Sequence, residues 1–237
     1  PILTYKVRPT GAEHGIVELV PNSHTVHHIK EIKQYSIQNF ILENNPDDTI
    51  KSFRKRFLKS CAVYCVITYL FGVGDRHLDN IMITNDGMIF NIDFSYILGR
   101  DPKPLTKVKM RISEDMIDAL GGVKSEYYEE FKILCTQIYN AIRKHVNLFI
   151  NMFMILSTIQ PDILPEQSVY DEIIERFLPG ENVEQAEIQL VNVIETSSDG
   201  YKSAVVDYFH GKKNIITKKS IMVPTQSVFG SIYGLFS

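Results

Sequence analysis

The sequence predicts a mostly helical α+β domain that carries two small β-hairpins. Three observations support this fold class. Helical patterns fill the chain after residue 125, an unusually apolar helix is expected over residues 49–71, and two pairs of short β-like runs are each joined by turn residues. A chain of 237 residues can form one large domain or two small ones, and these segments fit one lobe.

Composition and charge exclude several classes of protein. The net charge of −3 argues against a nucleic-acid binder with a basic surface, and 44% apolar with 22% charged residues is typical of a globular chain. The cysteines fall in apolar, helix-like stretches, so we expect buried reduced thiols and a cytosolic compartment. No signal segment is evident. The apolar stretch 146–156 is too short to span a bilayer and predicts a core helix.

The N-terminal part of the chain predicts a hairpin followed by a weak helix. Residues 2–8 and 15–20 are β-like runs, and the segment between them supplies turn residues. Residues 25–42 mix apolar and polar positions in a weak helical pattern. This pattern ends before Pro46, since proline disfavours helix in the residue that precedes it.

Strong helical patterns follow. A helix is expected from about residue 49 to residue 71, with Asp47 or Asp48 as its N-cap, and its second half is apolar all round, which predicts burial. Further helices are expected over residues 125–157, 166–178, 183–196 and 200–210.

A second hairpin is expected over residues 81–92. Two β-like runs, IMIT and MIFNI, flank the turn Asn85-Asp86-Gly87. Glycine suits the left-handed conformation that such a turn requires.

The register of this hairpin decides which side chains meet at its open end. A three-residue loop pairs Thr84 with Met88. Counting back, it pairs Asn80 with Ile92 and sets Asp93 beside Asn80. A two-residue loop would instead place Asn80 opposite Asp93. Either register leaves an amide oxygen and a carboxylate about 5 Å apart, and two hard oxygen ligands suit Mg²⁺ or Mn²⁺.

Asp75, Asn80 and Asp93 have the spacing of a kinase site. Asp75 precedes Asn80 by five residues, as in the catalytic loop D-x-x-x-x-N. Asp93-Phe94 follows the second strand, where kinases place the metal-binding D-F-G. An isolated Asn–Asp pair would more often be a strand end and a turn. The three features together are much rarer, so we predict Asn80 and Asp93 as metal ligands.

The order Asp75-Arg76-His77 departs from protein kinases, which carry His-Arg-Asp. Together with Asn80 and Asp93, this order resembles the phosphatidylinositol 3- and 4-kinases and their protein-kinase relatives. The resemblance implies that His77 is the base for the attacking hydroxyl, with Arg76 in the same catalytic set. Asp75 is the alternative base, or it orients His77 and the metal. ATP and Mg²⁺ or Mn²⁺ are the implied cofactors.

The resemblance also implies a protein-kinase-like fold with a nucleotide pocket. Glu18, Leu19 and Val20 resemble the family's hinge, where backbone groups bond adenine. Met82 and Ile92, one from each strand of the second hairpin, correspond to apolar residues that line the adenine pocket.

The segment 96–104, YILGRDPKP, closely resembles the activation segment of class III phosphatidylinositol 3-kinases, and Gly121-Gly122 resembles the end of that segment. This similarity implies that the substrate is plain phosphatidylinositol in a membrane surface, phosphorylated at the inositol 3-position. It also implies a cytoplasmic enzyme associated peripherally with intracellular membranes, with a regulatory subunit as a candidate partner and no nucleic acid. Dispersed basic residues would meet the headgroup: Arg100, Lys103, Lys107 and Lys109.

Within this fold we expect residues 1–20 to be the last N-lobe hairpin and the hinge, residues 21–213 the helical C-lobe, and residues 214–237 a tail. The chain has no G-x-G-x-x-G loop and no lysine at the expected place before the hinge. We therefore expect both elements upstream and expect this chain alone to be inactive. The tail combines lysines with apolar residues, which leaves open an interfacial membrane contact or a disordered or core-docked segment.

Two substitutions keep other functions open. Ser95 replaces the glycine of D-F-G, and Asn91 replaces a histidine that often lies two residues before Asp93. A degenerate kinase fold that acts as a scaffold or binding module is one alternative. The other is a protein kinase of the related large-kinase family, against which Leu78, in place of proline, and the tail both argue.

Overall fold

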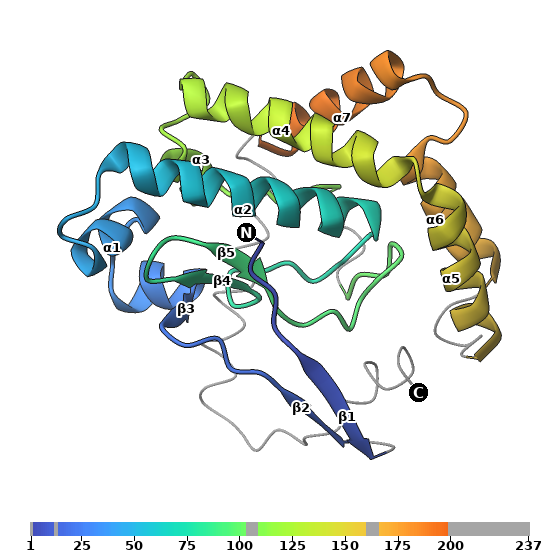
Figure 1. Ribbon diagram of the computed structural model, residues 1–237, viewed down its shortest axis with the longest axis horizontal. Helices are drawn as coiled ribbons and strands as arrows, with labels where there is room; N and C mark the ends of the chain where they lie inside the picture. The colour runs from blue at the N-terminus through green and yellow to red at the C-terminus, as the bar shows by residue number, and fades with distance from the viewer. Residues whose placement is uncertain (1, 12–13, 103–108, 160–165, 199–237) are drawn as a thin grey trace.

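Helix α2, Ile50–Leu70, crosses the centre of the computed structural model, and the other elements are arranged around it (Figure 1). The structure describes residues 2–11, 14–102, 109–159 and 166–198. Helix α4, Glu126–Arg143, packs along one side of α2, and a three-stranded sheet packs on the other. The β1–β2 hairpin projects from the sheet side. This mixed architecture, rich in helix, agrees with the predicted α+β class.

The remaining described elements complete this arrangement. The strands are β1 Val7–Gly11, β2 His14–Val17, β3 Ser23–Thr25, β4 Ile81–Thr84 and β5 Ile89–Asn91. A π-helical turn, η1, spans His28–Ile32. The other helices are α1 Ile37–Asn44, α3 Glu114–Ala119, α5 Val146–Ile159, α6 Glu166–Phe177 and α7 Val183–Ser198.

Helix α2 is the core of the molecule, as its apolar sequence predicted. Phe53, Phe57, Cys61 and Leu70 are fully or almost fully buried. Burying a side chain of this size stabilises a fold by about 1.5–3 kcal/mol. The three cysteines are free thiols inside this core, as expected.

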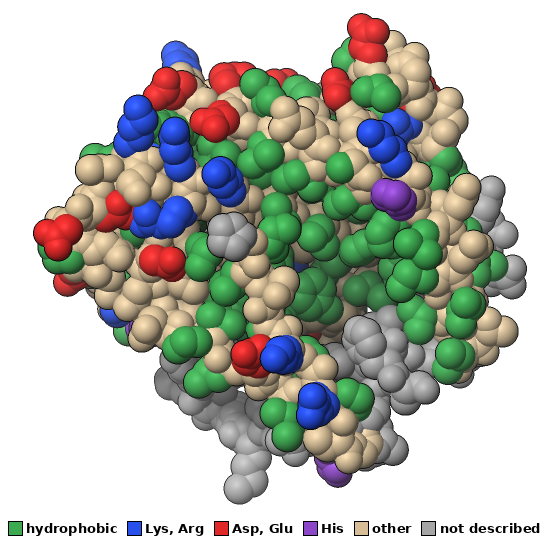
Figure 2. Space-filling model, viewed as in Figure 1, with side chains coloured by type: hydrophobic (Ala, Val, Ile, Leu, Met, Phe, Trp, Pro, Cys, Tyr) green, Lys and Arg blue, Asp and Glu red, His purple; other side chains and the backbone are tan. Residues whose placement is uncertain are grey.

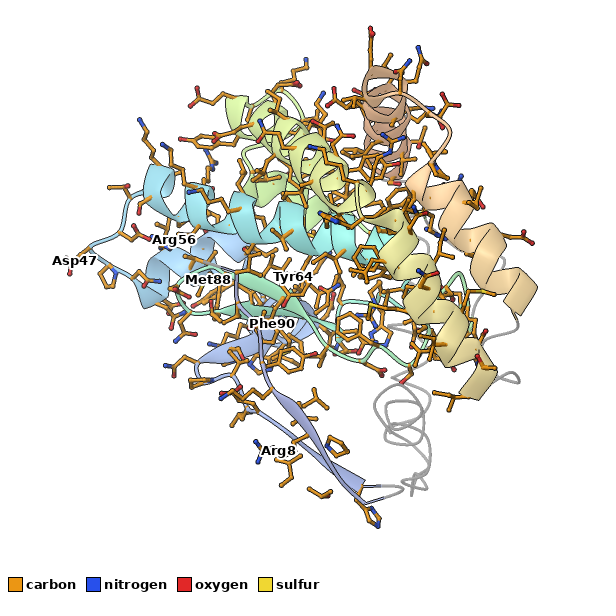
Figure 3. The ribbon with its side chains drawn as sticks, turned by 45° about the vertical axis from the view of Figure 1, so that its right-hand side comes forward. Arg8, Asp47, Arg56, Tyr64, Met88 and Phe90 are labelled. Atoms are coloured by element: carbon orange, nitrogen blue, oxygen red, sulfur yellow. The ribbon has the colours of Figure 1, made fainter. Side chains whose placement is uncertain are left out.

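Thr49 begins helix α2, and the expected cap at Asp47 or Asp48 is wrong. The Thr49 hydroxyl accepts a hydrogen bond from Ser52 N at 3.1 Å, which satisfies one of the donors at the helix start. The Asp48 carboxylate instead pairs with Arg56 and accepts from Thr49 N. Asp47 lies exposed at the tip of the turn, as Figure 3 shows.

The second hairpin has the three-residue loop. Thr84 N donates to Met88 O at 2.9 Å, and Ile81 pairs with Asn91 further along the ladder. Gly87 lies at φ +89°, in the region that glycine tolerates best. Strand β3 adds to the free edge of β4, which gives the sheet order β3-β4-β5.

The first hairpin exists, but its strands are displaced from the predicted runs. Strand β1 continues through Pro9 to Gly11, because proline is tolerated in a two-stranded ribbon with free edges. The ladder stops near Glu18, whose Oε2 accepts from Lys6 N at 2.8 Å in place of a backbone partner. Residues 18–20 therefore lie beyond the end of the strand.

The predicted weak helix over residues 25–42 is interrupted. Its first residue, Thr25, belongs to strand β3. Further along, Gln34 has a left-handed φ of +57°, which breaks the helix. Ser36 then caps α1 by accepting from Asn39 N at 3.1 Å.

The predicted helix 125–157 divides into α4 and α5 at residues 144–145. Helix α5 is not the core helix expected from its composition. Its packed face carries Phe149 and Phe153, whereas Leu148 and Ile155 on the other face are 56% and 62% exposed. Composition predicts how apolar a helix is, not how many of its faces find partners. The expected helix at 200–210 and the tail at 214–237 lie outside the described residues.

Aromatic rings tie the end of α2 to helices α5 and α6. The Phe71 ring lies 5.2 Å from Phe149, 5.7 Å from Phe153 and 6.4 Å from Phe177, measured between ring centroids. Such pairs contribute about 0.5–1.5 kcal/mol each beyond the area that they bury. The point where α2 passes into the following loop is therefore fixed from the α5–α6 side. Across the described ranges, no helix combines the length and the apolar character needed to cross a membrane.

The cap of α2 gives a first prediction. Thr49→Ala should lower the free energy of unfolding by about 1 kcal/mol, because the Ser52 amide loses its acceptor. Asp47→Ala is the matched control and should leave stability within about 0.5 kcal/mol. Urea denaturation measures both. Equal losses of unfolding free energy in the two variants would contradict the assignment of Thr49 as the N-cap.

Candidate functional site

The open end of the β4–β5 hairpin brings Asn80 and Asp93 together. Ile92 N donates to Asn80 O at 3.1 Å, so Asp93 follows directly after the residue paired with Asn80. This is the juxtaposition expected from a three-residue loop. Asp93 has a left-handed φ of +57°, which turns the chain away from the strand at this residue.

Hydrogen bonds from its nitrogen atoms hold the side chain of Asn80 in one orientation. Nδ2 donates to Asp75 O at 2.9 Å, and the backbone N donates to His77 O at 2.9 Å. Asn80 is buried. Its Oδ1 accepts no hydrogen bond from the residues that the structure describes. The side chain is thus fixed while its oxygen is left for a ligand.

Ser95 holds one oxygen of the Asp93 carboxylate. Ser95 Oγ donates to Asp93 Oδ1 at 2.6 Å, and Ser95 N donates to the same atom at 3.1 Å. Within the described part of the chain, Oδ2 accepts no hydrogen bond. The serine in place of glycine therefore adds a contact that orients the carboxylate and leaves its second oxygen available.

The two unengaged oxygen atoms are suitable ligands for a magnesium ion. Asn80 Oδ1 and Asp93 Oδ2 are hard oxygen atoms, and Mg²⁺ is usually held by one or two carboxylates with waters and substrate phosphates. Over the described ranges no group of three or more His, Cys, Asp or Glu side chains could enclose a metal ion. The sparse set suits a metal that arrives with a phosphate ligand better than a closed structural site.

Arg76 joins the loop that precedes Asn80 to the end of β5. Its Nη1 donates to Ile92 O at 2.7 Å, Nη2 donates to Asp93 O, and Nε donates to Gly74 O at 2.9 Å. The guanidinium also lies over the Phe94 ring. Arg76 is only 8% exposed, and this burial lowers its pKa to about 10, partly offset by the nearby carboxylates. All three hydrogen bonds hold backbone carbonyl groups, so the geometry gives Arg76 a positioning role.

His77 lies between two carboxylates. Its Nε2 is 3.7 Å from Asp75 Oδ2, and its Nδ1 is 3.9 Å from Asp79 Oδ2. Nδ1 accepts from Asp79 N at 3.2 Å, which assigns the proton of the neutral ring to Nε2, on the side of Asp75. Asp75 and His77, here called the Asp75–His77 unit, therefore face each other across a gap that is longer than a hydrogen bond.

Two residues near this unit were missed by sequence reasoning. Asp101 Oδ2 accepts from Asp75 N at 3.2 Å, so the segment after Asp93 folds back on the loop. Tyr5 Oη donates to Asn91 O at 3.0 Å, and its ring meets Phe90 edge-on at 6.0 Å. Asp101 lies inside the segment already singled out as important. For Tyr5, an aromatic residue in a β-like run was the only signal.

One face of the β4–β5 hairpin carries the predicted pocket residues. Side chains alternate along strands, so Met82 and Ile92 share a face with Asn80, whereas Ile81 and Ile83 face the core. Met82 and Ile92 are half-buried. Figure 3 shows Phe90 on the side of the sheet toward the N-terminal hairpin. Figure 2 shows a hollow with hydrophobic side chains in the face of the molecule above that hairpin.

Comparison with known proteins decides the family. The family model "Phosphatidylinositol 3- and 4-kinase" matches residues 2–163.

The chain belongs to the phosphatidylinositol 3- and 4-kinase family. This confirms the resemblance expected from the Asp75-Arg76-His77 order. The family has a protein-kinase-like fold, with which this mixed, helix-rich structure is consistent.

Named relatives agree with the class expected from the activation segment. "Phosphatidylinositol 3-kinase pik3" of Schizosaccharomyces pombe is 38% identical over 216 residues, which are 87% of this chain and 27% of that protein. "Phosphatidylinositol 3-kinase VPS34" of Arabidopsis thaliana is 41% identical over 174 residues, or 70% and 21%. The protein of that name in Saccharomyces cerevisiae is 36% identical over 213 residues, or 87% and 24%. The chain thus spans about a quarter of their length.

The hinge-like residues of this kinase-family chain present free backbone groups. Glu18 N donates to Lys6 O at 2.8 Å, and Val20 O accepts from Ser23 Oγ at 2.8 Å. Glu18 O and Val20 N make no hydrogen bond with any residue in the described ranges. Leu19, between them, is 86% exposed. An alternating acceptor and donor of this kind could pair with the edge of a base.

The predicted headgroup residues are only partly described. Arg100 is exposed, with its guanidinium 6.0 Å from the Tyr96 ring centroid. Lys109 Nζ lies 2.8 Å from Glu175 Oε1 of α6. Lys103 and Lys107 lie outside the described residues.

The contacts of Arg76 give a second prediction. Arg76→Lys keeps the charge but leaves one nitrogen for three carbonyl oxygens. We expect the free energy of unfolding to fall by roughly 2–4 kcal/mol, since each buried acceptor left unpaired costs about 1–3 kcal/mol. Arg100→Lys, at an exposed guanidinium, is the control and should change it by less than about 0.5 kcal/mol. Chemical denaturation of both proteins is the measurement, and an Arg76→Lys protein of unchanged stability contradicts the assignment.

Proposed function

We propose that this chain carries the catalytic part of a lipid kinase that transfers the γ-phosphoryl group of ATP to an inositol hydroxyl of phosphatidylinositol, at the 3-position. The observation that supports this most directly is that Asn80, Asp93 and the Asp75–His77 unit lie together at the open end of one hairpin. Phosphoryl transfer needs positioning and charge stabilisation more than covalent chemistry from the protein.

The amide and the carboxylate would hold the metal–nucleotide complex. A bound Mg²⁺ supplies positive charge that offsets the charge developing on the transferred phosphoryl group. Asn80 contributes a neutral oxygen whose direction is set by its bond to Asp75 O. Asp93 contributes the charged oxygen that Ser95 leaves free.

The Asp75–His77 unit would accept the proton of the attacking hydroxyl. Nδ1 of His77 is engaged by Asp79 N, so Nε2 is the nitrogen that can exchange a proton. Nε2 can take the hydroxyl proton when the neutral ring holds its own proton on Nδ1, a tautomer that gives up the hydrogen bond from Asp79 N, and Asp75, 3.7 Å away, then stabilises the imidazolium. A proton accepted directly by Asp75 gives the same net result. An imidazole near neutral pH changes its protonation at little cost.

The nucleotide would lie between the two hairpins. Glu18 O and Val20 N are free to bond adenine, Leu19 flanks them, and Met82 and Ile92 offer a half-buried apolar surface. In this proposal residues 1–20 are the last N-lobe hairpin and the hinge, residues 21–213 are the C-lobe, and residues 214–237 are a tail.

The lipid would approach along the segment that begins at Arg100. The names of the relatives support phosphatidylinositol as the substrate and the 3-position as the acceptor. Arg100, Lys103, Lys107 and Lys109 are the cations proposed to face an anionic headgroup. Peripheral association of a cytoplasmic enzyme with intracellular membranes follows from this substrate. A regulatory subunit stays a prediction from the family resemblance.

Two substitutions test the reaction. With the protein purified at its natural length, the product made from phosphatidylinositol and ATP should be the 3-phosphate, identified by chromatography against the 4- and 5-phosphates. His77→Ala and Asp93→Ala should each lower kcat/KM by about 10³-fold or more, because each removes a group that acts on charge or proton in the transition state. His145→Ala, at an exposed residue in the turn just before α5, is the control. Full activity in either variant contradicts the proposal.

Ser95 gives a further prediction about the metal. Ser95→Ala removes one of the two bonds to Asp93 Oδ1, so the Mg²⁺ concentration needed for half-maximal rate should rise by about tenfold. The KM for phosphatidylinositol should stay within about twofold, because Ser95 contacts the metal-binding carboxylate and not the lipid segment. A magnesium titration at saturating ATP measures this. An unchanged requirement would show that the hydroxyl does not orient Asp93.

A further inference from the structure

Helix α6 holds an ion pair over the turn that joins the catalytic loop to the activation segment. Arg176 Nε and Nη2 both lie 2.8 Å from Glu172 Oε2, and Arg176 is 5% exposed. Nη1 donates to Tyr69 O at 2.9 Å, a carbonyl in the last turn of α2. The Tyr69 ring also lies under this guanidinium, 5.6 Å away. The pair is therefore anchored on the helix that leads into the catalytic loop.

Two backbone segments meet beneath this ion pair. Three backbone hydrogen bonds of 2.8 to 2.9 Å join residues 71–74 to residues 96–99. The first segment leads directly to Asp75 and His77. The second leads to Arg100 and the start of the proposed lipid segment. The position of the proposed lipid segment relative to Asp75 and His77 thus depends on how residues 71–74 and 96–99 are held together.

The Glu172 carboxylate lies directly against the backbone of the second segment, residues 96–99, at Gly99. Gly99 has φ +76°, and a methyl group added to it would lie 1.8 Å from Glu172 Oε1. At Gly72, an added methyl group would lie 2.5 Å from Gly99 N and 3.1 Å from Arg176 Nε. No side chain separates the carboxylate from the backbone of Gly99. The Glu172 carboxylate therefore lies directly against the turn, and its ion pair with Arg176 restricts its movement.

The nucleotide end of the same segment is held by other contacts. Asp93 O and Ile92 O are bonded to Arg76, and Asp93 Oδ1 is bonded to Ser95. None of these hydrogen bonds involves a residue of α6. The metal-binding end and the lipid end of the stretch from Asp93 to Arg100 are consequently fixed by different side chains.

We propose that Glu172 and Arg176 are positioning residues for lipid phosphorylation: they fix Gly99, and through it the segment that begins at Arg100, relative to His77. Neither residue touches the reacting atoms. The inference rests on the proposed function, because the effect that it names is on the use of the lipid acceptor. It predicts that these residues affect the lipid reaction and leave use of ATP unchanged.

Glu172→Gln is the direct test, since it keeps the shape of the side chain and removes the charge that Arg176 holds. In the protein at its natural length, kcat/KM for phosphatidylinositol in vesicles should fall by about tenfold, as expected for a small misplacement of reacting groups. The KM for ATP and the hydrolysis of ATP without lipid should stay within about twofold. Glu129→Gln, at an exposed carboxylate that pairs with Lys132 on α4, is the matched control.

A coupling measurement tests the contact itself. Gly99→Ala and Glu172→Ala should each lower kcat/KM for the lipid, and the double variant should lose clearly less than the product of the two losses, because the added methyl group no longer meets the carboxylate. Independent, multiplicative losses would overturn the proposal. So would a Glu172→Gln enzyme with unchanged lipid kinetics, or one in which lipid phosphorylation and lipid-free ATP hydrolysis fall together.

Hydrogen exchange separates this inference from the proposed function. The amides of Leu98 and Gly99 are bonded to Phe71 O and Gly72 O, so Glu172→Gln should speed their exchange by about fivefold or more. Exchange in α4 should not change. If the unaltered protein makes no phosphoinositide, the proposed function fails. The exchange result then decides the positioning role alone, and unchanged exchange at residues 96–100 overturns it.

Discussion

The buried guanidinium of Arg76 is the interaction on which the rest of the site depends. It binds the carbonyl oxygens of Gly74, Ile92 and Asp93, and so joins the catalytic loop to the end of strand β5. Around it the chain accepts left-handed backbone at two residues other than glycine, Asp75 at φ +53° and Asp93 at φ +57°. Such conformations cost of order 1 kcal/mol each and persist only where surrounding contacts impose them. The constraint leaves Asn80 Oδ1 and Asp93 Oδ2 unengaged by the rest of the described chain, and both atoms suit the same cation.

Contacts from two sides of the molecule hold this site in place. The sheet side, through Arg76, Ser95 and the hairpin register, fixes the groups proposed to meet the metal and ATP. The helical side, through the Phe71 aromatic cluster and α6, fixes the turn from which the proposed lipid segment departs. This separation has a physical advantage for the proposed reaction. Contacts on the α6 side can set the proposed lipid segment without involving the groups that are proposed to bind magnesium.

The loop length of one hairpin was enough to predict that Asn80 and Asp93 lie side by side. A three-residue loop with Gly87 at its left-handed position sets the register, and the register alone places Asp93 beside Asn80. The residues that were missed depend on distant parts of the chain. Arg176 meets Tyr69 across 107 positions and Tyr5 meets Asn91 across 86, and no periodicity predicts such contacts. The Thr49 cap was misassigned because three neighbouring residues could all cap, and only Arg56 decides against Asp48. The exposed face of α5 was misassigned because its sequence does not show how few neighbours it has.

The central claim is that Asn80 and Asp93 together hold the metal of a metal–nucleotide complex. Its most direct test is a crystal structure of the protein at its natural length with Mn²⁺ and a non-hydrolysable ATP analogue, with the metal located by its anomalous scattering. The predicted result is a metal ion about 2.1–2.3 Å from both Asn80 Oδ1 and an oxygen of Asp93, bridging to the phosphates. A metal held by phosphate oxygens alone, with both side chains turned away from it, would contradict this account.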